Sequence, residues 1–386
     1  NLVKMTEGAD RPDARTTLMR YDGFDRKIAQ LSAEGASQVT DTMSATDIQE
    51  VWDSRSSAYT YNGVDKLTSS VDANQIKTAF YYDDDGRLAI SVNAMGEVTE
   101  SQYNAFGQIT AAIRYGTRIS ANRNGGRLAT STIGVDIATV SDPLKDSVTH
   151  YAYNALGQLS RVTDALDGYV ASYYNAFGEK ASTWTSTLNG GNSRGETYAY
   201  DRRGQLTSST YDSGGIKAQT TAIYDAFGRV IQTSIGTEGS DIGRQYRNLG
   251  WDKLGRQVSS QNALGKYSST TYDAFGRILT VTNELYQVTT FSFDRSSRSV
   301  TMTTAEGVKV KTIHDAYGQT ISITDGNNIA TTFGYDNDGH QTFKKIGSAI
   351  VEQREYDSGG RLTATIDGQE TRTKITYDSA NRAITR

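Results

Sequence analysis

The sequence predicts an all-β protein built from tandem antiparallel β-hairpins of about 21 residues each, joined into one long coiled sheet. Three observations lead to this fold class. A short aromatic-and-carboxylate motif recurs along the chain, its copies keep a constant step, and the stretches between copies alternate turn residues with β-branched residues. A sheet this wide has to curl or coil, because the twist between neighbouring strands has a fixed hand.

The motif is clearest at Tyr272-Asp273-Ala274-Phe275-Gly276-Arg277-Ile278, and residues 224–230 repeat it almost letter for letter. Residues 103–109 and 153–159 carry Asn in place of Asp. Because a dozen equivalent positions do not form a specific catalytic constellation, we expect the motif residues to be structural. The expected structural positions are Tyr61, Asn62, Tyr82, Asp83, Gly86, Tyr103, Asn104, Gly107, Tyr153, Asn154, Gly157, Tyr174, Asn175, Gly178, Tyr200, Asp201, Gly204, Tyr224, Asp225, Gly228, Trp251, Asp252, Gly255, Tyr272, Asp273, Gly276, Tyr335, Asp336, Gly339, Tyr356, Asp357, Gly360, Tyr377 and Asp378.

The spacing of the copies is the strongest evidence for a repeat protein. From Trp251 the copies begin at 272, 293, 314, 335, 356 and 377, each 21 residues after the last. The same step separates 61, 82 and 103, and also 153 and 174. Weaker copies begin at Tyr21, Phe293 and His314, and degenerate copies are expected from Thr40 and Asn122 in the two longer gaps.

Each unit contains a second, weaker turn about halfway along, at 93–96, 164–167, 262–265 and 325–328. Asp and Asn favour turns through their own side chains, and Gly allows positive φ. Two turns per unit leave about six or seven residues for each connecting run, a common strand length. Runs such as 277–282 and 320–324 are rich in β-branched residues, so we expect roughly thirty strands.

The domain organisation follows from the repeat. Residues 1–20 are expected to be a lead-in or an incomplete unit, and residues 21–386 a single repeat region. Longer insertions fall at 114–150, expected to hold a longer hairpin and a loop, and at 187–196, expected to be a loop tip. The stretch 44–53 allows a short helix, with Ser44 and Asp47 at capping-box spacing, or a mid-unit turn at Trp52-Asp53, and we prefer the turn. Both ends of the sequence suggest a piece of a longer chain.

Composition excludes several classes of function. The net charge is −4 and the pI is near 5.6, so no basic field points to nucleic acid. The absence of Cys removes disulfides, thiolate metal sites and a Cys nucleophile. No apolar run approaches about 18 residues, so we expect no membrane span.

Other residues with chemical potential favour a structural interpretation. Arg87, Arg229, Arg256, Arg277 and Arg361 lie five positions after the motif aromatic and are expected to bond neighbouring turns or carboxylates. The motif Tyr rings are expected to stack as a ladder. The loop beginning at Asp336 resembles a calcium loop, but its twelfth position is Gly347 and not Glu. The three His residues fall in different units at no ligand spacing, so we expect no metal, cofactor or catalytic site.

The motif Tyr-Asp-Ala-Phe-Gly-Arg at a period of 21 resembles the YD repeats of the Rhs family, from about Tyr21 to Arg386. The family includes bacterial Rhs polymorphic toxins, the B and C components of insecticidal toxin complexes, and teneurin shells. The resemblance implies a fragment of a β-sheet that spirals into a hollow cocoon around a C-terminal toxin. The family's Asp-Pro self-cleavage motif is missing, since Asp142-Pro143 lies inside the 114–150 insertion, and no toxin or delivery domain is found in this sequence.

The sequence therefore predicts a non-catalytic structural shell that encapsulates a toxin or effector polypeptide of the same chain before delivery. Its expected partners are this cargo and the remaining repeats and delivery domains of the parent chain, and its expected location is secreted or at the cell surface. The alternative is a surface adhesion or contact module that displays loops 114–150 and 187–196, with glycan binding by exposed Tyr residues and Trp184. A carbohydrate-active enzyme is disfavoured because the sequence lacks a non-repeated carboxylate cluster.

Overall fold

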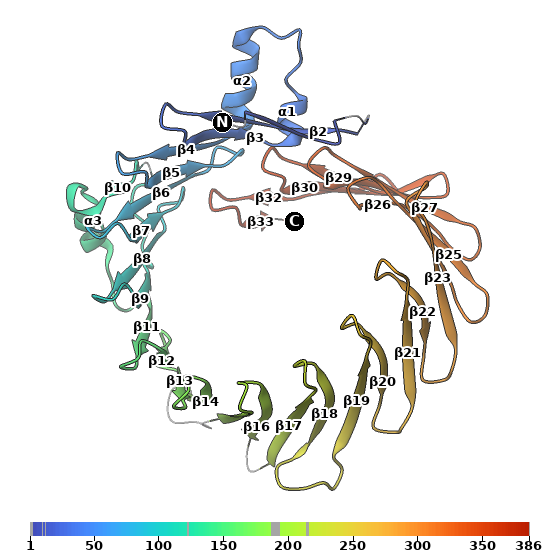
Figure 1. Ribbon diagram of the computed structural model, residues 1–386. Helices are drawn as coiled ribbons and strands as arrows, with labels where there is room; N and C mark the ends of the chain where they lie inside the picture. The colour runs from blue at the N-terminus through green and yellow to red at the C-terminus, as the bar shows by residue number, and fades with distance from the viewer. Residues whose placement is uncertain are drawn as a thin grey trace. The chain divides into compact units, whose positions relative to one another are not determined.

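The computed structural model describes residues 3–9, 11, 13–121, 123–186, 194–213 and 216–385. The described residues form an all-β protein in which 31 strands belong to one sheet and two more form a short separate pair (Figure 1). Apart from one two-residue parallel contact, the strand pairs described are antiparallel. The predicted fold class is confirmed.

The elements follow one another as hairpins with few interruptions. The helices are α1 (Ala33–Ser37), α2 (Ala45–Arg55), α3 (Ile133–Val140) and the 3₁₀ turn η1 (Leu128–Thr130). The strands are β1 (Lys4–Glu7), β2 (Arg15–Tyr21), β3 (Lys27–Leu31), β4 (Ser57–Tyr61), β5 (Leu67–Val71), β6 (Lys77–Tyr82), β7 (Leu88–Val92), β8 (Val98–Tyr103), β9 (Ile109–Arg114), β10 (Gly126–Arg127), β11 (Ser147–Tyr153), β12 (Leu159–Thr163), β13 (Tyr169–Tyr174), β14 (Lys180–Ser186), β15 (Arg194–Tyr200), β16 (Leu206–Ser213), β17 (Ile216–Tyr224), β18 (Val230–Thr237), β19 (Gln245–Trp251), β20 (Gln257–Gln261), β21 (Tyr267–Tyr272), β22 (Ile278–Thr282), β23 (Val288–Asp294), β24 (Ser299–Thr303), β25 (Lys309–His314), β26 (Thr320–Thr324), β27 (Ala330–Tyr335), β28 (Gln341–Ile346), β29 (Ala349–Tyr356), β30 (Leu362–Asp367), β31 (Arg372–Lys374), β32 (Thr376–Tyr377) and β33 (Ala383–Thr385).

The chain divides into two compact units, and each is described by itself. Unit 1 comprises Asn1–Ser147, Ser296–Ser299 and Lys311–Arg386, and unit 2 comprises Val148–Arg295 and Val300–Val310. Within unit 2 each strand from β12 to β22 pairs with the next in sequence, so this stretch is a meander.

The hairpins that begin at the motif share one irregularity. On β21, Tyr272 pairs with Ile278 while Thr271 pairs with Thr280, so the register shifts by one residue at the aromatic. The turn between them carries Gly276 at φ 82°. A type I turn followed by a residue in the left-handed region gives this one-residue bulge, which matches the twist of the flanking strands. Glycine therefore occupies this position of the motif because it can adopt the positive φ that the turn needs.

The stretch 44–53 is a helix, so the preferred mid-unit turn at Trp52-Asp53 was wrong. Helix α2 begins after the N-cap Ser44, whose hydroxyl accepts from the Asp47 N–H, while the Asp47 carboxylate accepts from the Ser44 N–H. This capping box satisfies two backbone donors at the first turn. The degenerate copy expected from Thr40 is also wrong, because α1 and α2 with their connecting turn occupy that gap.

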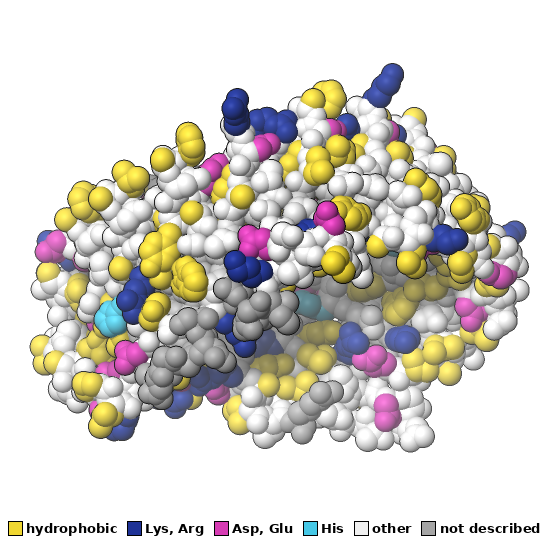
Figure 2. Space-filling model, turned by 90° about the horizontal axis from the view of Figure 1, so that it is seen from below, with side chains coloured by type: hydrophobic (Ala, Val, Ile, Leu, Met, Phe, Trp, Pro, Cys, Tyr) yellow, Lys and Arg dark blue, Asp and Glu magenta, His cyan; other side chains and the backbone are white. Residues whose placement is uncertain are grey.

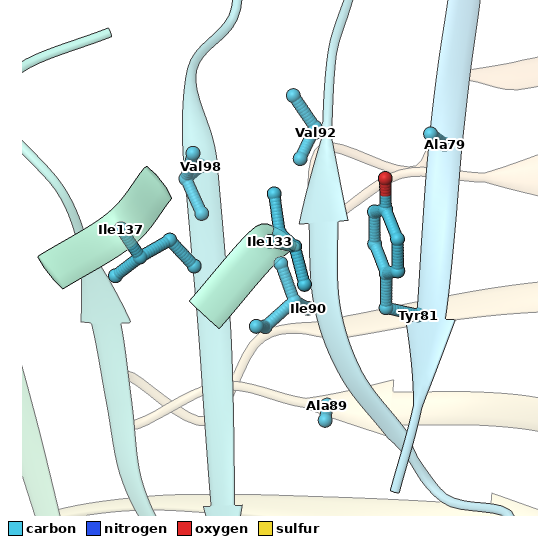
Figure 3. Packing of buried hydrophobic residues seen from close by; sticks show 8 residues of the cluster. All are labelled: Ala79, Tyr81, Ala89, Ile90, Val92, Val98, Ile133 and Ile137. Atoms are coloured by element: carbon cyan, nitrogen blue, oxygen red, sulfur yellow. The ribbon is translucent and has the colours of Figure 1, made fainter. Parts of the chain in front are cut away.

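The 114–150 insertion holds a helix and not the longer hairpin that we expected. Residues 126–127 form the short strand β10, which runs parallel to β6, and α3 follows after η1. Figure 3 shows Ile133 and Ile137 of α3 lying over Ile90 and Val98 of the sheet. The copy expected from Asn122 does not form a hairpin in the described residues, and Asn122 itself lies outside them.

Hydrophobic cores in the described residues are small and lie beneath helices. One cluster joins Ile133 and Ile137 to Ala79, Tyr81, Ala89, Ile90, Val92 and Val98. The other joins Leu31 to Ala36 of α1 and Trp52 of α2. Both belong to unit 1. The described strands of unit 2 carry no buried cluster of this kind, so their stability has to come from pairing and from contacts at the turns.

The N-terminal lead-in and the expected loop tip at 187–196 both contain strand residues. Within the lead-in 1–20, residues 4–7 and 15–20 lie in the antiparallel strands β1 and β2, which pair from Lys4 opposite Leu18 to Glu7 opposite Arg15. Of the expected loop tip 187–196, residues 187–193 lie outside the described residues. Residues 194–196, which we expected in the loop tip, belong to β15.

The requirement for glycine at the positive-φ position can be tested at a turn where an added side chain would meet no other atom. Gly107 has φ 78°, and a Cβ placed on it would meet no atom within 4 Å. We expect Gly107→Ala to lower the free energy of unfolding by about 1–2 kcal/mol, the cost of holding an L-residue in the left-handed region. Urea unfolding of the whole chain measures the change.

The matched control is Gly63→Ala. Gly63 also lies in a motif turn and also has open space around its Cβ, but its φ is outside the left-handed region. This variant should unfold at the wild-type urea concentration or slightly above it. Equal destabilisation by the two variants would contradict a role for backbone conformation.

Candidate functional site: the bridged turns

The carboxylate or amide of the motif closes its own turn. The Asp273 Oδ1 accepts hydrogen bonds from the N–H groups of Phe275 and Arg277, both at 2.9 Å. The backbone adds two more, because the Gly276 N–H donates to the Asp273 carbonyl and the Asp273 N–H donates to the Arg277 carbonyl. The short side chains of Asp and Asn are well suited to accept from backbone N–H groups two and four positions later.

The structure places every predicted Asp or Asn of the motif in this turn. The same two backbone N–H groups donate to the side-chain Oδ1 of Asn62, Asp83, Asn104, Asn154, Asn175, Asp201, Asp225, Asp252, Asp357 and Asp378. Asp336 accepts from the His340 N–H. The motif glycines have φ between 76° and 91° at Gly86, Gly107, Gly157, Gly178, Gly204, Gly228, Gly255, Gly276, Gly339 and Gly360.

The mid-unit turns use the same hydrogen bonds. Asn262 Oδ1 accepts from the N–H groups of Leu264 and Lys266, both at 3.0 Å. Asn93, Asp164 and Asp325 do the same in their turns. The predicted second turn is therefore confirmed, and in hydrogen bonding it is the equal of the first. The aromatic side chain is what distinguishes the two.

In most units the motif aromatic ties the unit to the one before it. The Tyr272 hydroxyl donates at 2.8 Å to the carbonyl of Gln257, the sixth residue after Trp251, which opens the preceding copy. Tyr103 reaches Leu88 in the same way, six positions after Tyr82. In each case the acceptor is the first residue of the strand that returns from the preceding turn. We call this hydrogen bond the aromatic bridge.

The aromatic bridge does not depend on the length of chain between its partners. Donor and acceptor are 15 residues apart for Tyr272 but 34 for Tyr61, where α1 and α2 intervene. The other bridges run from Tyr82 to Leu67, Tyr174 to Leu159, Tyr200 to Lys180, Tyr224 to Leu206, Trp251 to Val230, Tyr335 to Thr320, Tyr356 to Gln341 and Tyr377 to Leu362. The insertion of α1 and α2 is therefore accommodated without loss of this contact.

The arginine five positions after the aromatic adds a second link. Arg256 Nε donates to Asp252 Oδ2 at 2.7 Å within its own turn, and its Nη1 donates to the Asp273 carbonyl of the next turn at 3.1 Å. Its guanidinium lies 4.6 Å from the centre of the Tyr272 ring. Arginine suits this place because its planar fork can bond a carboxylate while its face covers an aromatic ring.

This cation–ring contact recurs and modifies the expected ladder of Tyr rings. A guanidinium from one unit covers the aromatic of the next in the pairs Arg26–Tyr61, Arg87–Tyr103, Arg229–Trp251, Arg277–Phe293 and Arg361–Tyr377. The ladder thus alternates cations with rings. The expectation that these arginines bond neighbouring turns or carboxylates is confirmed.

In other turns a glutamine takes the place of the arginine. Asn154 Nδ2 donates to Gln158 Oε1, and Gln158 Nε2 donates at 3.0 Å to the carbonyl of Gly178 in the next turn. Gln205 and Gln319 reach the next turn's glycine carbonyl in the same manner. At 340 a histidine takes the place of the arginine, contacts Asp336 at 3.0 Å and stacks on the Tyr356 ring.

The turn hydrogen bonds also lower the pKa of several motif carboxyls. The Arg256 N–H lowers the pKa of Asp252, partial desolvation opposes it, and the Arg256 guanidinium lowers it further. The pKa values of Asp22, Asp83, Asp201, Asp225, Asp273 and Asp378 are also below their ordinary range. A low pKa keeps the carboxylate ionised and hydrogen-bonded. This suits a residue that stabilises a turn and does not suit a general acid.

Within unit 1, turns from the two ends of the chain also contact each other. The Tyr317 hydroxyl donates to the carbonyls of Glu7 and Asp13, and Arg15 lies 3.9 Å from its ring centre. Glu34 accepts from the N–H and the amide of Asn337. Further along, the Gly359 N–H donates to Asn74, Asn381 to Asp72, and Arg382 to Glu97.

The tips of many motif turns carry exposed apolar side chains. The third residue after the aromatic is between 72% and 89% exposed at Phe24, Val64, Phe106, Leu156, Phe177, Phe227, Leu254 and Phe275. On the face drawn in Figure 2, hydrophobic side chains protrude singly along the outline, while cationic and anionic side chains are interspersed over the described residues.

The part of the chain that the structure describes was compared with the requirements of a metal site and of a membrane-spanning helix. No three His, Cys, Asp or Glu side chains there gather as a ligand set. None of the described helices has the length and hydrophobicity that a membrane crossing needs. The residues that sequence reasoning missed are the carbonyl acceptors of the aromatic bridges, since any residue type supplies a carbonyl and only the constant position marks them.

Comparisons with known proteins agree with this geometry. Residues 251–287 match the family model described as RHS Repeat. In fold the chain is similar to the crystal structures of TcdB2-TccC3-Cdc42, with a TM-score of 0.57, and of TcdB2-TccC3, with a TM-score of 0.56, each at 14% identity. These matches cover 96% of this chain and 21% and 22% of those chains, so this chain spans about a fifth of their length. No curated protein matches the chain in sequence.

The aromatic bridge can be tested by removing one hydroxyl. We expect Tyr272→Phe to lower the free energy of unfolding by about 1 kcal/mol, because the ring stays and one hydrogen bond to a partly buried carbonyl is lost. Urea unfolding measures the change. Tyr267→Phe is the control, since Tyr267 lies on the same strand with its side chain half-exposed. Equal effects from the two variants would contradict the bridge.

The lowered carboxyl pKa values predict acid sensitivity. A group whose pKa is lower in the folded state stabilises the fold above its unfolded pKa, and this contribution is lost as the pH falls through the folded value. We therefore expect the urea midpoint to be flat above about pH 4, the ordinary range of Asp, and to fall below it.

The matched variant replaces three Asp–Arg pairs with the Asn–Gln pair that the chain already uses at Asn104 and Gln108. The changes are Asp225→Asn, Asp252→Asn and Asp273→Asn, with Arg229→Gln, Arg256→Gln and Arg277→Gln. Its midpoint should decline less steeply with acid than that of the wild type. A wild-type midpoint that rises with acid would refute the assignment.

Proposed function

Because this chain belongs to the YD-repeat, or Rhs, family, we propose that it is a non-catalytic wall segment of a shell that encloses a toxin or effector polypeptide of the same parent chain. The observation that carries the proposal is the aromatic bridge, which joins most units to the preceding one and is kept where α1 and α2 are inserted. An element of this kind builds a continuous wall.

The distribution of buried residues supports a wall and not a folded core. The hydrophobic clusters lie only beneath α1, α2 and α3, and the described strands of unit 2 are paired without such a cluster. Their hydroxyl side chains pair across strands instead, as between Thr271 and Thr280 at 2.6 Å. A sheet held by hydrogen bonds at its turns and between its strands leaves its faces free for contact with another polypeptide.

The pairing of the strands supports enclosure without aggregation. A strand that is paired on both sides presents no free backbone edge, and free edges are sites of unwanted association. Most of the described strands have a partner on each side, as β21 has β20 and β22. A wall made in this way can hold an incompletely folded chain without pairing with it.

The proposed partners are the cargo and the other segments of the parent chain. The cargo would be held by many weak contacts with polar and aromatic side chains, so the wall would not select one cargo sequence. The proposed location is outside the producing cell or at its surface, in keeping with delivery of an effector. Both assignments rest on the family and on the fold.

A second candidate is a contact module at the cell surface. The exposed apolar tips favour it, because Phe106 and Phe177 are each 89% exposed and would suit contact with another surface. Trp184 is also 40% exposed. In this case the sheet would display the tips and would enclose nothing.

The two candidates differ in the fate of residues outside the repeats. The experiment is native limited proteolysis of the full-length protein that contains this sequence, followed by mass spectrometry. Encapsulation predicts that a segment outside the repeats resists protease in the full-length protein and is digested when it is expressed alone. Digestion at equal rates in both samples would argue against enclosure, as would a cryo-electron microscopy map of a rod without an internal space.

A further inference from the structure

One edge of the sheet in unit 2 carries a row of exposed apolar and cationic side chains. The row consists of the second and third residues after the motif aromatic in six consecutive motif turns, and we call it the tip row. Its members are Ala155, Leu156, Ala176, Phe177, Arg202, Arg203, Ala226, Phe227, Lys253, Leu254, Ala274 and Phe275. Its five Leu and Phe side chains are between 75% and 89% exposed. Apolar side chains that recur at one exposed position mark a contact surface.

The meander brings these turns to the same end of the strands. Each strand from β11 to β22 pairs with the next in sequence, so every second turn lies at the same edge of the sheet. Neighbouring motif turns are two strands apart, which places their tips about 10 Å from one another. The edge therefore presents its apolar side chains singly and at regular intervals.

The turns hold the tips in place. Asp273 Oδ1 accepts from the Phe275 N–H at 2.9 Å, and Asp225 Oδ1 accepts from the Phe227 N–H at the same distance. Gly276 completes the first of these turns with φ 82°. The tips are therefore preorganised, so little conformational entropy is lost when they contact a partner.

The charged side chains of the tip row are all cationic. Arg202, Arg203 and Lys253 are exposed, whereas the motif carboxylates Asp225 and Asp273 point back into their turns and pair with arginines at 2.6 and 2.7 Å. The turns at the opposite edge of unit 2 expose carboxylates instead, at Asp167, Glu238, Asp241 and Glu284. Although the whole chain has a net charge of −4, the motif edge of unit 2 is suited to an anionic partner.

Turns that contact other turns of this chain carry different tips. Where turns from the two ends of the chain meet in unit 1, the third residue after the aromatic is Tyr317, Asp338, Gly359 or Ala380. The Tyr317 hydroxyl, the Asp338 carboxylate and the Gly359 N–H make hydrogen bonds there. Contacts between turns in this chain thus rely on hydrogen bonds, which the Leu and Phe side chains of the tip row cannot make.

A lipid surface matches both properties of the tip row. Single apolar side chains about 10 Å apart require a protein partner with holes at the same period, whereas lipid headgroups can part around a side chain at any position. Binding at a bilayer surface grows with the apolar area that enters it, and cations that face anionic lipids strengthen it. The tip row supplies apolar area and cations together, on turns that are already rigid.

We propose that the tip row docks unit 2 on the surface of a bilayer that contains anionic lipids. The Leu and Phe side chains enter the headgroup region, while Arg202, Arg203 and Lys253 face the lipid phosphates. The contact is with the surface of the bilayer and needs no membrane-spanning segment. The proposal goes beyond the shell function, because a wall that encloses a cargo and a wall that encloses nothing can both dock in this way.

The first test is flotation of the whole chain with lipid vesicles. One set of vesicles is phosphatidylcholine alone, and the other is a mixture of phosphatidylcholine and phosphatidylserine. We expect the chain to float with the mixed vesicles, to float less with phosphatidylcholine alone, and to dissociate from the mixed vesicles as salt rises. A chain that stays at the bottom of the gradient with the mixed vesicles would overturn the proposal.

The second test asks which edge enters the bilayer. Phe275→Trp places a fluorescent side chain in the tip row, and mixed vesicles whose acyl chains carry bromine should quench the added fluorescence. Leu285→Trp is the matched control, because Leu285 is also an exposed apolar tip of unit 2 but lies at the opposite edge. Its added fluorescence should be unaffected by the same vesicles. Equal quenching of the two variants would contradict docking through the motif edge.

The third test removes the apolar tips. The triple variant Phe177→Ser, Phe227→Ser and Phe275→Ser should lower the partition coefficient for the mixed vesicles by about a hundredfold or more, since each apolar side chain withdrawn from water contributes about tenfold. The control variant carries Leu166→Ser, Leu264→Ser and Leu285→Ser at the opposite edge and should stay within about twofold of the wild type. Thermal melts check folding, and Phe227→Ser alone replaces the triple variant if that one unfolds.

Two further results would overturn the proposal. Equal weakening by the two triple variants would mean an unspecific attraction to exposed apolar side chains. Sedimentation velocity decides the other case: a chain that fails to float but forms an oligomer, which the Phe→Ser triple variant dissociates, would assign the tip row to a second copy of the chain.

Discussion

The hydrogen bond from most motif aromatics to the preceding unit holds the repeated hairpins at a constant offset. A single-layer sheet has no core to hold consecutive hairpins at a constant offset. The donor at Tyr272 and the acceptor at Gln257 do this locally, because a partly buried carbonyl that loses its partner costs free energy. The same bond survives when α1 and α2 are inserted between Lys27 and Tyr61. Insertions can therefore add function without disturbing the wall.

Two chemical forms of the turn perform the same task. Asp with Arg links one turn to the next through an ion pair, a carbonyl and a covered ring, as Arg256 does. Asn with Gln links them through neutral amides, as Gln158 does to Gly178. The charged form depends on pH and salt, whereas the neutral form does not. A chain that mixes both spreads its stability over two kinds of interaction.

Unit 1 shows how the repeated wall acquires local differences. Its helices supply the small hydrophobic cores, and its terminal turns contact each other through residues such as Tyr317 and Glu34. A pocket of about 1060 Å³ also lies here, where residues 115–118 of the 114–150 insertion and the turn that begins at Asp378 meet regular strands. Special features thus gather where the 21-residue step is interrupted, and the regular stretch serves as the frame.

The sequence by itself determined the strands, both turns of each unit and the glycine positions. All of these rest on contacts within about five residues, such as Asp273 with Arg277, which a local pattern can reveal. The tertiary structure alone decided that 44–53 folds as a helix against Leu31, that α3 covers Val98, and which carbonyl each aromatic bonds. These outcomes depend on burial and on partners 15 or more residues away, for which neighbouring residue types hold no signal.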